Sequence, residues 1–90
     1  MTDPTPLPLE DLQLFAAVAR LRSFSRTAAE LSIPVATLSR RIAALEHRLG
    51  AQLLRRTTRR VEPTDAGALL LARADEPLRA LADALDCLGE

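Results

Sequence analysis

Arginine is concentrated in the middle of this chain of 90 residues. Ten of the twelve basic residues, every one an arginine, lie between residues 20 and 60, where two acids accompany them. Each guanidinium group presents a planar fork of hydrogen-bond donors, which suits a phosphate or the major-groove edge of guanine. The formal net charge is zero, but this block carries +8 between two acidic flanks. A local block of this kind indicates an anionic partner that the net charge conceals.

Arg40 and Arg41 belong to a short run whose residue types suit contact with DNA. An arginine can pair with N7 and O6 of guanine, hydroxyl groups can bond a base or a phosphate, and valine can touch a thymine methyl group. If the run opens a helix, its side chains can meet base edges in the major groove. We therefore predict DNA contacts by Val35, Ala36, Thr37, Ser39, Arg40 and Arg41. An ordinary amphipathic helix with a solvated arginine face is the alternative.

A second arginine cluster follows at residues 55–60, with four guanidinium groups in six residues. Two short segments, 51–56 and 61–63, flank a polar tip and predict a small β-hairpin. Arg59 and Arg60 lie at this tip without an obvious carboxylate partner. We predict that both contact phosphates or an adjacent minor groove, whose negative potential attracts arginine. Arg56 either shares this role or pairs internally and serves only the fold.

Three helices are expected ahead of the hairpin. The first begins at Leu9 and ends near residues 21–23, and Ser25 is the expected N-cap of a second helix that ends near residue 31. The third covers residues 35–49 and ends at Gly50. Its apolar stripe, expected to face the core, recurs at spacings of four, three and four: Leu38, Ile42, Leu45 and Leu49. The second and third helices, joined by a brief turn, are a candidate helix-turn-helix.

A longer helix is expected from Thr64, its N-cap, to about Leu88. Leucine and alanine form a heptad seam along it: Leu71, Ala74, Leu78, Leu81, Leu85 and Leu88. The preceding domain of about sixty residues cannot cover the whole seam, which is typical of helices that pair with another chain. We therefore predict a homodimer through this helix. Pro77 either bends the helix or divides it into two pieces.

Composition argues against catalytic and cofactor chemistry. One cysteine and one histidine can form neither an internal disulfide nor a structural zinc site. His47 and Cys87 lack the neighbours that nucleophilic catalysis needs, and no glycine-rich phosphate loop is present. No apolar run approaches the roughly 18 residues that span a bilayer. We expect a cytoplasmic protein that is not an enzyme and uses no catalytic residue, metal, cofactor or membrane.

The run from Leu12 to Gly67 resembles the N-terminal DNA-binding region of LysR-type transcriptional regulators. Five stretches carry the likeness: LQLFAAVA at 12–19, SFSRTAAEL at 23–31, LSRRIAALE at 38–46, LGAQLLRRT at 49–57 and PTDAG at 63–67. The resemblance implies a mainly α fold, a winged helix-turn-helix of three helices and a hairpin wing, followed by a linker helix that pairs antiparallel in a dimer. It also implies that Ser39 and Arg40 contact DNA and that Arg59 is the wing arginine. Pro34, Val35 and Ala36 depart from the Ser-Gln-Pro that often opens the family's recognition helix.

Together these features predict a flexible leader at 1–8, a winged helix-turn-helix DNA-binding domain at 9–63 and a linker and dimerisation helix at 64–90. The resemblance implies a larger effector-binding domain that this chain does not contain, so we expect part of a longer regulator. The predicted function is sequence-specific binding of double-stranded DNA, as a dimer on a partly palindromic promoter site; a tetramer of the intact regulator stays open. The alternative is a helical protein-interaction module without DNA binding, which would not need the arginines at 55–60.

Overall fold

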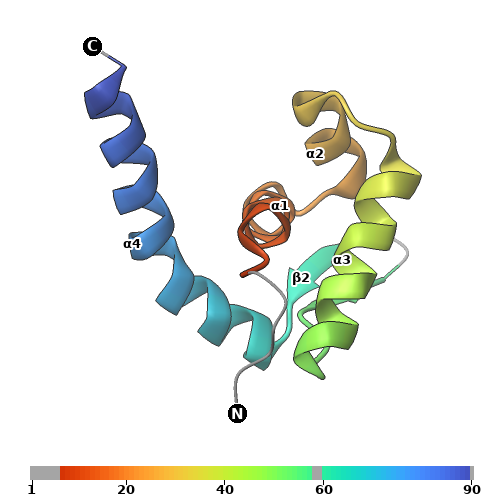
Figure 1. The fold of residues 1–90 in the computed structure, drawn as a ribbon. Coiled ribbons are helices and arrows are strands. Elements are labelled where there is room, and N and C mark those ends of the chain that lie inside the picture. Colours follow the sequence, from red (N-terminus) through yellow and green to blue (C-terminus); the bar gives the residue numbers. More distant parts are fainter. Residues whose placement is uncertain (1–6, 58–59, 90) are drawn as a thin grey trace.

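The computed structural model describes residues 7–57 and 60–89. The elements follow in the order α1 (Leu9–Leu21), α2 (Phe24–Leu31), α3 (Val35–Leu49), β1 (Leu54–Arg56), β2 (Val61–Pro63) and α4 (Asp65–Leu88). The first three helices gather beside a two-stranded antiparallel hairpin, and α4 extends away from them as a long arm (Figure 1). This arrangement confirms the predicted fold, a winged helix-turn-helix followed by one long helix.

The core lies between the first three helices. Phe15 and Val18 of α1 meet Leu38, Ile42 and Leu45 of α3, and each of the five side chains is at most 1% exposed. Leu49, which the apolar stripe predicted to face the core, is instead 44% exposed. It is the last residue of α3, where the chain turns away through Gly50 in the left-handed region (φ 68°). The stripe therefore extends one turn beyond the core that it serves.

The second helix begins earlier than the sequence predicted. Ser23, not Ser25, is the N-cap: its hydroxyl accepts a hydrogen bond from the backbone N–H of Arg26 at 3.0 Å. Phe24 is the first residue of the helix and is 8% exposed. Burial of this ring against the core fixes where the chain enters the helix, and a serine lies directly before it to satisfy an unpaired N–H. Ser25 consequently lies within the first turn.

The hairpin is joined closely to the start of α4. Leu54 pairs with Pro63 and Arg56 with Val61 in an antiparallel register. Thr64 caps α4 as predicted, since its hydroxyl accepts from the N–H of Gly67 at 3.0 Å. A Cβ atom on Gly67 would lie 2.0 Å from the carbonyl oxygen of Leu53. The close approach of these two backbones therefore requires glycine at this position.

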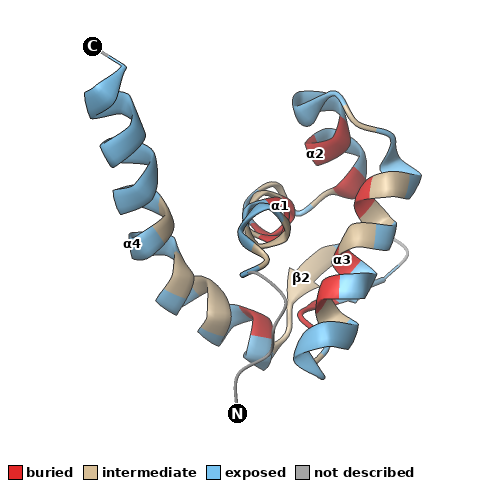
Figure 2. Cartoon of the chain, in the orientation of Figure 1, coloured by how far each residue is buried: buried red, intermediate tan, exposed pale blue. Residues whose placement is uncertain are grey.

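The long helix α4 runs as one element of 24 residues with Pro77 inside it. The structure thus favours a continuous helix over two separate pieces. The first half of the predicted seam, Leu71, Ala74 and Leu78, is half-buried. Exposure then rises along the helix, to 50% at Leu81 and 71% at Leu85, and Figure 2 shows the far end of α4 exposed on every turn. The domain covers one half of the seam only.

Candidate DNA-binding surface

The start of α3 is exposed and open to a ligand. Pro34 precedes the helix in an extended conformation (ψ 142°) and its side chain makes no capping bond, so no N-cap side chain satisfies the first N–H groups of α3, which carry partial positive charge. Val35 is 45% exposed, and Ala36 is exposed beside it. The small side chains predicted to approach base edges therefore do stand on the surface.

Arg40 lies one turn further along the same surface. Its side chain is exposed, and Nη2 donates a long hydrogen bond of 3.4 Å to the hydroxyl of Thr37. Within the described parts of the chain, no carboxylate lies within ion-pair distance of this guanidinium. No described carboxylate therefore neutralises the charge of Arg40, and an anionic or acceptor-rich partner can reach its exposed side chain.

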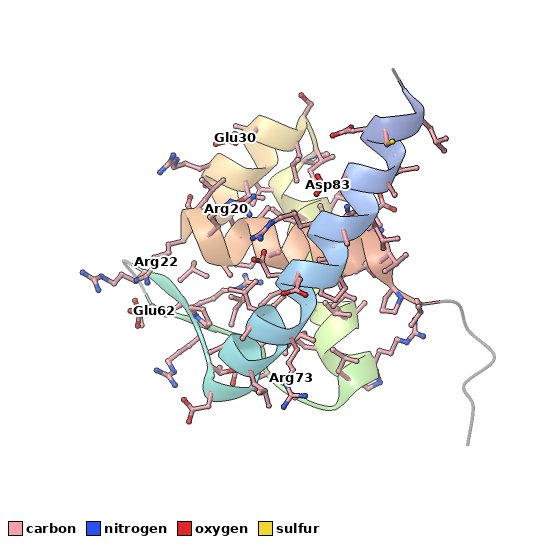
Figure 3. All side chains as sticks on the ribbon, turned by 90° about the vertical axis from the view of Figure 1, so that its left-hand side faces the viewer. Arg20, Arg22, Glu30, Glu62, Arg73 and Asp83 are labelled. Carbon is pink, nitrogen blue, oxygen red and sulfur yellow. The ribbon has the colours of Figure 1, made fainter. Side chains whose placement is uncertain are left out.

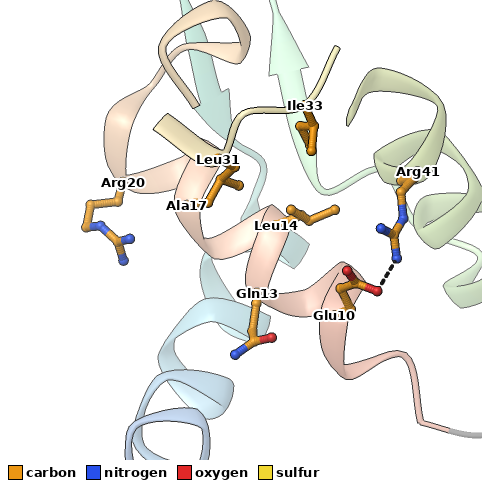
Figure 4. A pocket seen from close by; sticks show the side chains of 8 residues that line it. All are labelled: Glu10, Gln13, Leu14, Ala17, Arg20, Leu31, Ile33 and Arg41. Carbon is orange, nitrogen blue, oxygen red and sulfur yellow. Dashed lines mark hydrogen bonds and ion pairs between the residues drawn. The ribbon is translucent and has the colours of Figure 1, made fainter. Parts of the chain in front are cut away.

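Arg41 is placed differently from its neighbour. Its guanidinium lies 2.9 Å from Glu10 Oε1 and 2.7 Å from Asp11 Oδ1, both in the first turn of α1. Figure 4 shows the pair with Glu10 beside a pocket between α1 and the turn before α3. The hydrogen bond and charge of Arg41 lower the pKa of Glu10, and the bond to Glu10 raises the pKa of Arg41. These contacts hold α3 against α1, whereas the sequence suggested a DNA contact.

Arg56 links the hairpin to the helices. Its Nη2 donates a hydrogen bond of 3.0 Å to Ser39 Oγ, and its Cζ lies 3.9 Å from the centroid of the Phe24 ring. Arg56 therefore makes internal contacts in this structure, and its share in DNA contact stays a prediction. Through Arg56, strand β1 contacts α3 at Ser39, directly before the exposed Arg40.

Arg60 has a carboxylate nearby, contrary to the expectation for the tip. Its guanidinium lies 3.7 Å from Glu62, which is also 3.8 Å from Arg22 at the end of α1; Figure 3 shows Arg22 and Glu62 close together. Hydrogen bonds between Thr57 and Arg60, including a backbone bond of 2.8 Å, close the described base of the tip. Arg59 lies outside the described residues.

Glu46 is a supporting residue that the sequence analysis did not identify. Its Oε2 accepts hydrogen bonds from the backbone N–H groups of Leu53 at 2.8 Å and Leu54 at 3.1 Å. The carboxylate of α3 therefore fixes the chain just as it enters β1. The single acid of an otherwise basic helix, next to Leu45 of the apolar stripe, is the sequence signal that could have revealed it.

Two other kinds of site are absent from the described residues. Across 7–57 and 60–89, no group of three or more histidine, cysteine or acidic residues is arranged to hold a metal ion. Among the helices of these same segments, none has both the length and the hydropathy that crossing a membrane requires. The exposed arginines of α3 and the hairpin are the feature that distinguishes this surface. Fold and surface together define the class of the protein, a winged helix-turn-helix DNA-binding domain.

Comparison with known proteins agrees with this class. The family model described as bacterial regulatory helix-turn-helix protein, lysR family, matches residues 9–68. The regulator PgrR of Escherichia coli is 43% identical over 91% of this chain, and the activator AmpR of Rhodobacter capsulatus is 38% identical over 97%. The chain belongs to the lysR family of bacterial regulatory helix-turn-helix proteins. It spans about a quarter of PgrR and under a third of AmpR (27% and 30%).

Solved structures show the same arrangement. A complex of the BenM DNA-binding domain with catB site 1 DNA superposes with a TM-score of 0.84 at 34% identity, and the match covers 92% of both chains. The oxidized form of OxyR from Corynebacterium glutamicum superposes with a TM-score of 0.87 at 36% identity, covering 96% of this chain and 28% of OxyR. The first of these comparisons matches nearly the whole of the other chain, and the second matches a little over a quarter of a longer chain.

Proposed function

We propose that this domain binds specific sequences of double-stranded DNA, with the start of α3 in the major groove and the hairpin on the adjacent backbone or minor groove. The observation that carries the proposal is Arg40, an exposed guanidinium at the start of a helix with no carboxylate beside it in the described residues. A helix in the major groove presents this end to base edges. The BenM complex, a solved structure of similar fold, holds DNA.

The two arginine clusters have separate parts in the proposal. The residues proposed to face bases are Val35, Ala36, Thr37, Ser39 and Arg40. Arg60 is proposed to bind phosphate, because its exposed pair with Glu62 at 3.7 Å is weak enough for a phosphate to displace. Arg59 is included for its match to the family's wing arginine. Arg41 is assigned to holding α3 in place rather than to DNA.

Dimerisation is the second part of the proposal. The seam residues Leu71, Ala74, Leu78, Leu81, Leu85 and Leu88 would bury their exposed faces against the same helix of a second copy. Leu85 and Leu88 are 71% and 84% exposed, and exposed leucines aligned at heptad spacing favour a helical partner. Two copies would present their α3 helices about 34 Å apart, one turn of DNA, on a partly palindromic promoter site. We propose that the domain acts as part of a cytoplasmic transcriptional regulator that is not an enzyme.

Selection of duplexes from a random-sequence library tests DNA recognition directly. The wild-type chain should enrich one motif, and Arg40→Ala should then weaken binding to it by about 1–3 kcal/mol and relax preference at one base pair. Arg73→Ala, on α4, is the matched control and should bind as the wild type does. Equal losses on the selected and on random duplexes would contradict base reading by Arg40.

A salt titration separates phosphate contact from base reading. Arg59→Ala should weaken binding to selected and random duplexes alike and reduce the slope of log affinity against log salt by about 0.9. An unchanged slope would remove the wing from the contact surface. If the chain forms a stable dimer but enriches no duplex, the exposed seam of α4 would favour the alternative function, a helical interaction module.

A further inference from the structure

The guanidinium of Arg56 joins three elements at the edge of the DNA-binding surface. It comes from β1, lies 3.9 Å above the Phe24 ring of α2 and donates a bond of 3.0 Å to Ser39 of α3. Phe24 is 8% exposed, so packing holds the ring that supports the cation. A cation over an aromatic face is attracted by the ring quadrupole. The Phe24 ring and the Ser39 hydroxyl therefore hold the guanidinium of Arg56 in one orientation.

The contact determines how the Ser39 hydroxyl can bond. A serine hydroxyl has one proton to donate and two lone pairs that accept, whereas a guanidinium has donors only. Ser39 must therefore accept from Arg56, and its own proton remains for another partner. The neighbouring positive charge polarises the O–H bond and makes that proton a stronger donor. Ser39 is half-buried and directly precedes the exposed Arg40, so a ligand on Arg40 lies within its reach.

We propose that Arg56 is a positioning residue that makes Ser39 a hydrogen-bond donor toward DNA; this inference rests on the proposed function. In the major groove, guanine N7 and O6, adenine N7 and thymine O4 are acceptors, whereas the amino groups of cytosine and adenine are donors. Ser39 therefore favours an edge that presents an acceptor. Arg56 contributes to sequence preference through Ser39 and not through a contact of its own with a base.

A double-mutant cycle tests this coupling. Arg56→Lys keeps the positive charge but loses the planar fork that both stacks and donates, and Ser39→Ala removes the hydroxyl. The probes are the duplex that the wild-type chain enriches from a random library and the same duplex with each base pair replaced in turn. Each single variant should weaken binding about five- to tenfold, the effect of losing one hydrogen bond next to a charge. Both should lose preference at the same base pair, and the double variant should bind as Ser39→Ala does.

Two further measurements separate positioning from direct contact. Because Arg56 is proposed to contact no phosphate, Arg56→Gln, which removes the charge, should keep the salt slope of the wild type. Phe24→Leu, which keeps an apolar side chain but removes the ring face, should lose preference at the same base pair as Arg56→Lys. Arg73→Lys on α4 is the matched control and should leave affinity and preference unchanged. Thermal melts establish the temperature at which all variants are folded for the binding measurements.

The outcomes distinguish this inference from the function on which it rests. Losses in Arg56→Lys and Ser39→Ala that multiply in the double variant would show independent contacts and overturn the inference. Wild-type affinity and preference in Arg56→Lys would overturn it as well. In either case a wild-type chain that enriches one motif leaves the proposed DNA recognition standing. A wild-type chain that enriches no duplex would overturn the proposed function itself.

Discussion

Two exposed surfaces of this domain differ in how their side chains are positioned. The start of α3 and the described part of the hairpin form a basic surface in which two arginines are fixed by contacts across the fold: Arg41 on Glu10 at 2.9 Å and Arg56 on Ser39 at 3.0 Å. The distal half of α4, residues 77–88, carries an exposed apolar face on a helix that leaves the domain (Figure 1). There Leu85 and Leu88 are among the most exposed large apolar residues described.

The contrast indicates how each surface depends on the rest of the molecule. Recognition of base edges needs side chains placed accurately, so the basic surface depends on ion pairs and hydrogen bonds from α1, α2 and β1. A leucine seam needs only helical periodicity, because any second helix of matching period can complete it. We call the helices and the hairpin that position the basic surface the framework. Substitutions in the framework should impair folding and DNA contact, whereas substitutions in the distal half of α4 should change association alone.

Leu81→Asp should have the largest effect, confined to association. In a symmetric dimer each copy loses a leucine and buries a carboxylate, about 2 kcal/mol per copy or roughly a thousandfold in the dimer dissociation constant. Sedimentation equilibrium should report a monomer with an unchanged melting curve at low concentration. Ala80→Asp is the control, because at 100° per residue Ala80 lies away from the seam and should leave the dimer intact. A dimer that persists in Leu81→Asp would place the interface elsewhere.

Gly67→Ala should be the most damaging framework substitution. The added methyl would meet the Leu53 carbonyl oxygen at 2.0 Å, and backbone must shift to make room. We expect a loss of about 3 kcal/mol in the free energy of unfolding, typical of overpacking that rigid neighbours cannot relieve. Gly89→Ala is the matched control: its new Cβ would meet atoms no closer than 3.5 Å, with a change within about 0.5 kcal/mol. Denaturant titration measures the free energy of unfolding of both variants. Equal values would show that the backbones of Leu53 and α4 move apart at little cost.

Local sequence signals predicted the elements better than their contacts. Thr64 was identified as the cap of α4 because a threonine before an acidic first turn is a short-range pattern, and the structure confirms it. Ser25 was the wrong choice of cap because burial of Phe24, a tertiary effect, decides where α2 begins. Leu49 continues the stripe of α3 in sequence, but the extent of the core is set by the other helices and not by periodicity.

The candidate site shows the same difference between local sequence signals and tertiary contacts. Exposure of Arg40 followed from helical geometry, since the stripe of Leu38 and Ile42 turns Arg40 outward. The partners of Arg41 did not follow, because Glu10 is 31 residues away in sequence and only the packing of α1 on α3 brings them together. Arg56 and Ser39, 17 residues apart, are brought together in the same way. Which arginines are available to DNA is thus a property of the tertiary fold.

Glu46→Ala should weaken the framework on the side of the hairpin. It leaves the partly buried N–H groups of Leu53 and Leu54, now bonded to Oε2 at 2.8 and 3.1 Å, without their carboxylate. The expected loss is about 2 kcal/mol, since a charged acceptor shared by two donors is worth more than a neutral one. Glu30→Ala, on the exposed side of α2, should change stability by less than about 0.5 kcal/mol. A Glu46→Ala variant as stable as the wild type would mean that water replaces the carboxylate there.

Glu10→Gln should have the smallest effect and should depend on pH. Arg41 lowers the pKa of Glu10 in the folded protein, so the pair contributes stability above the ordinary carboxylate pKa near 4.5 that is lost as pH falls through the lowered value. The melting temperature of Glu10→Gln should therefore lie below that of the wild type at neutral pH, and the difference should shrink between about pH 5 and pH 2. High salt should reduce this difference too, because the Glu10 side chain is 72% exposed and exposed charges are screened. Asp83→Asn, on the distal half of α4, is the control, and a difference that grows on acidification would contradict the role given to Arg41.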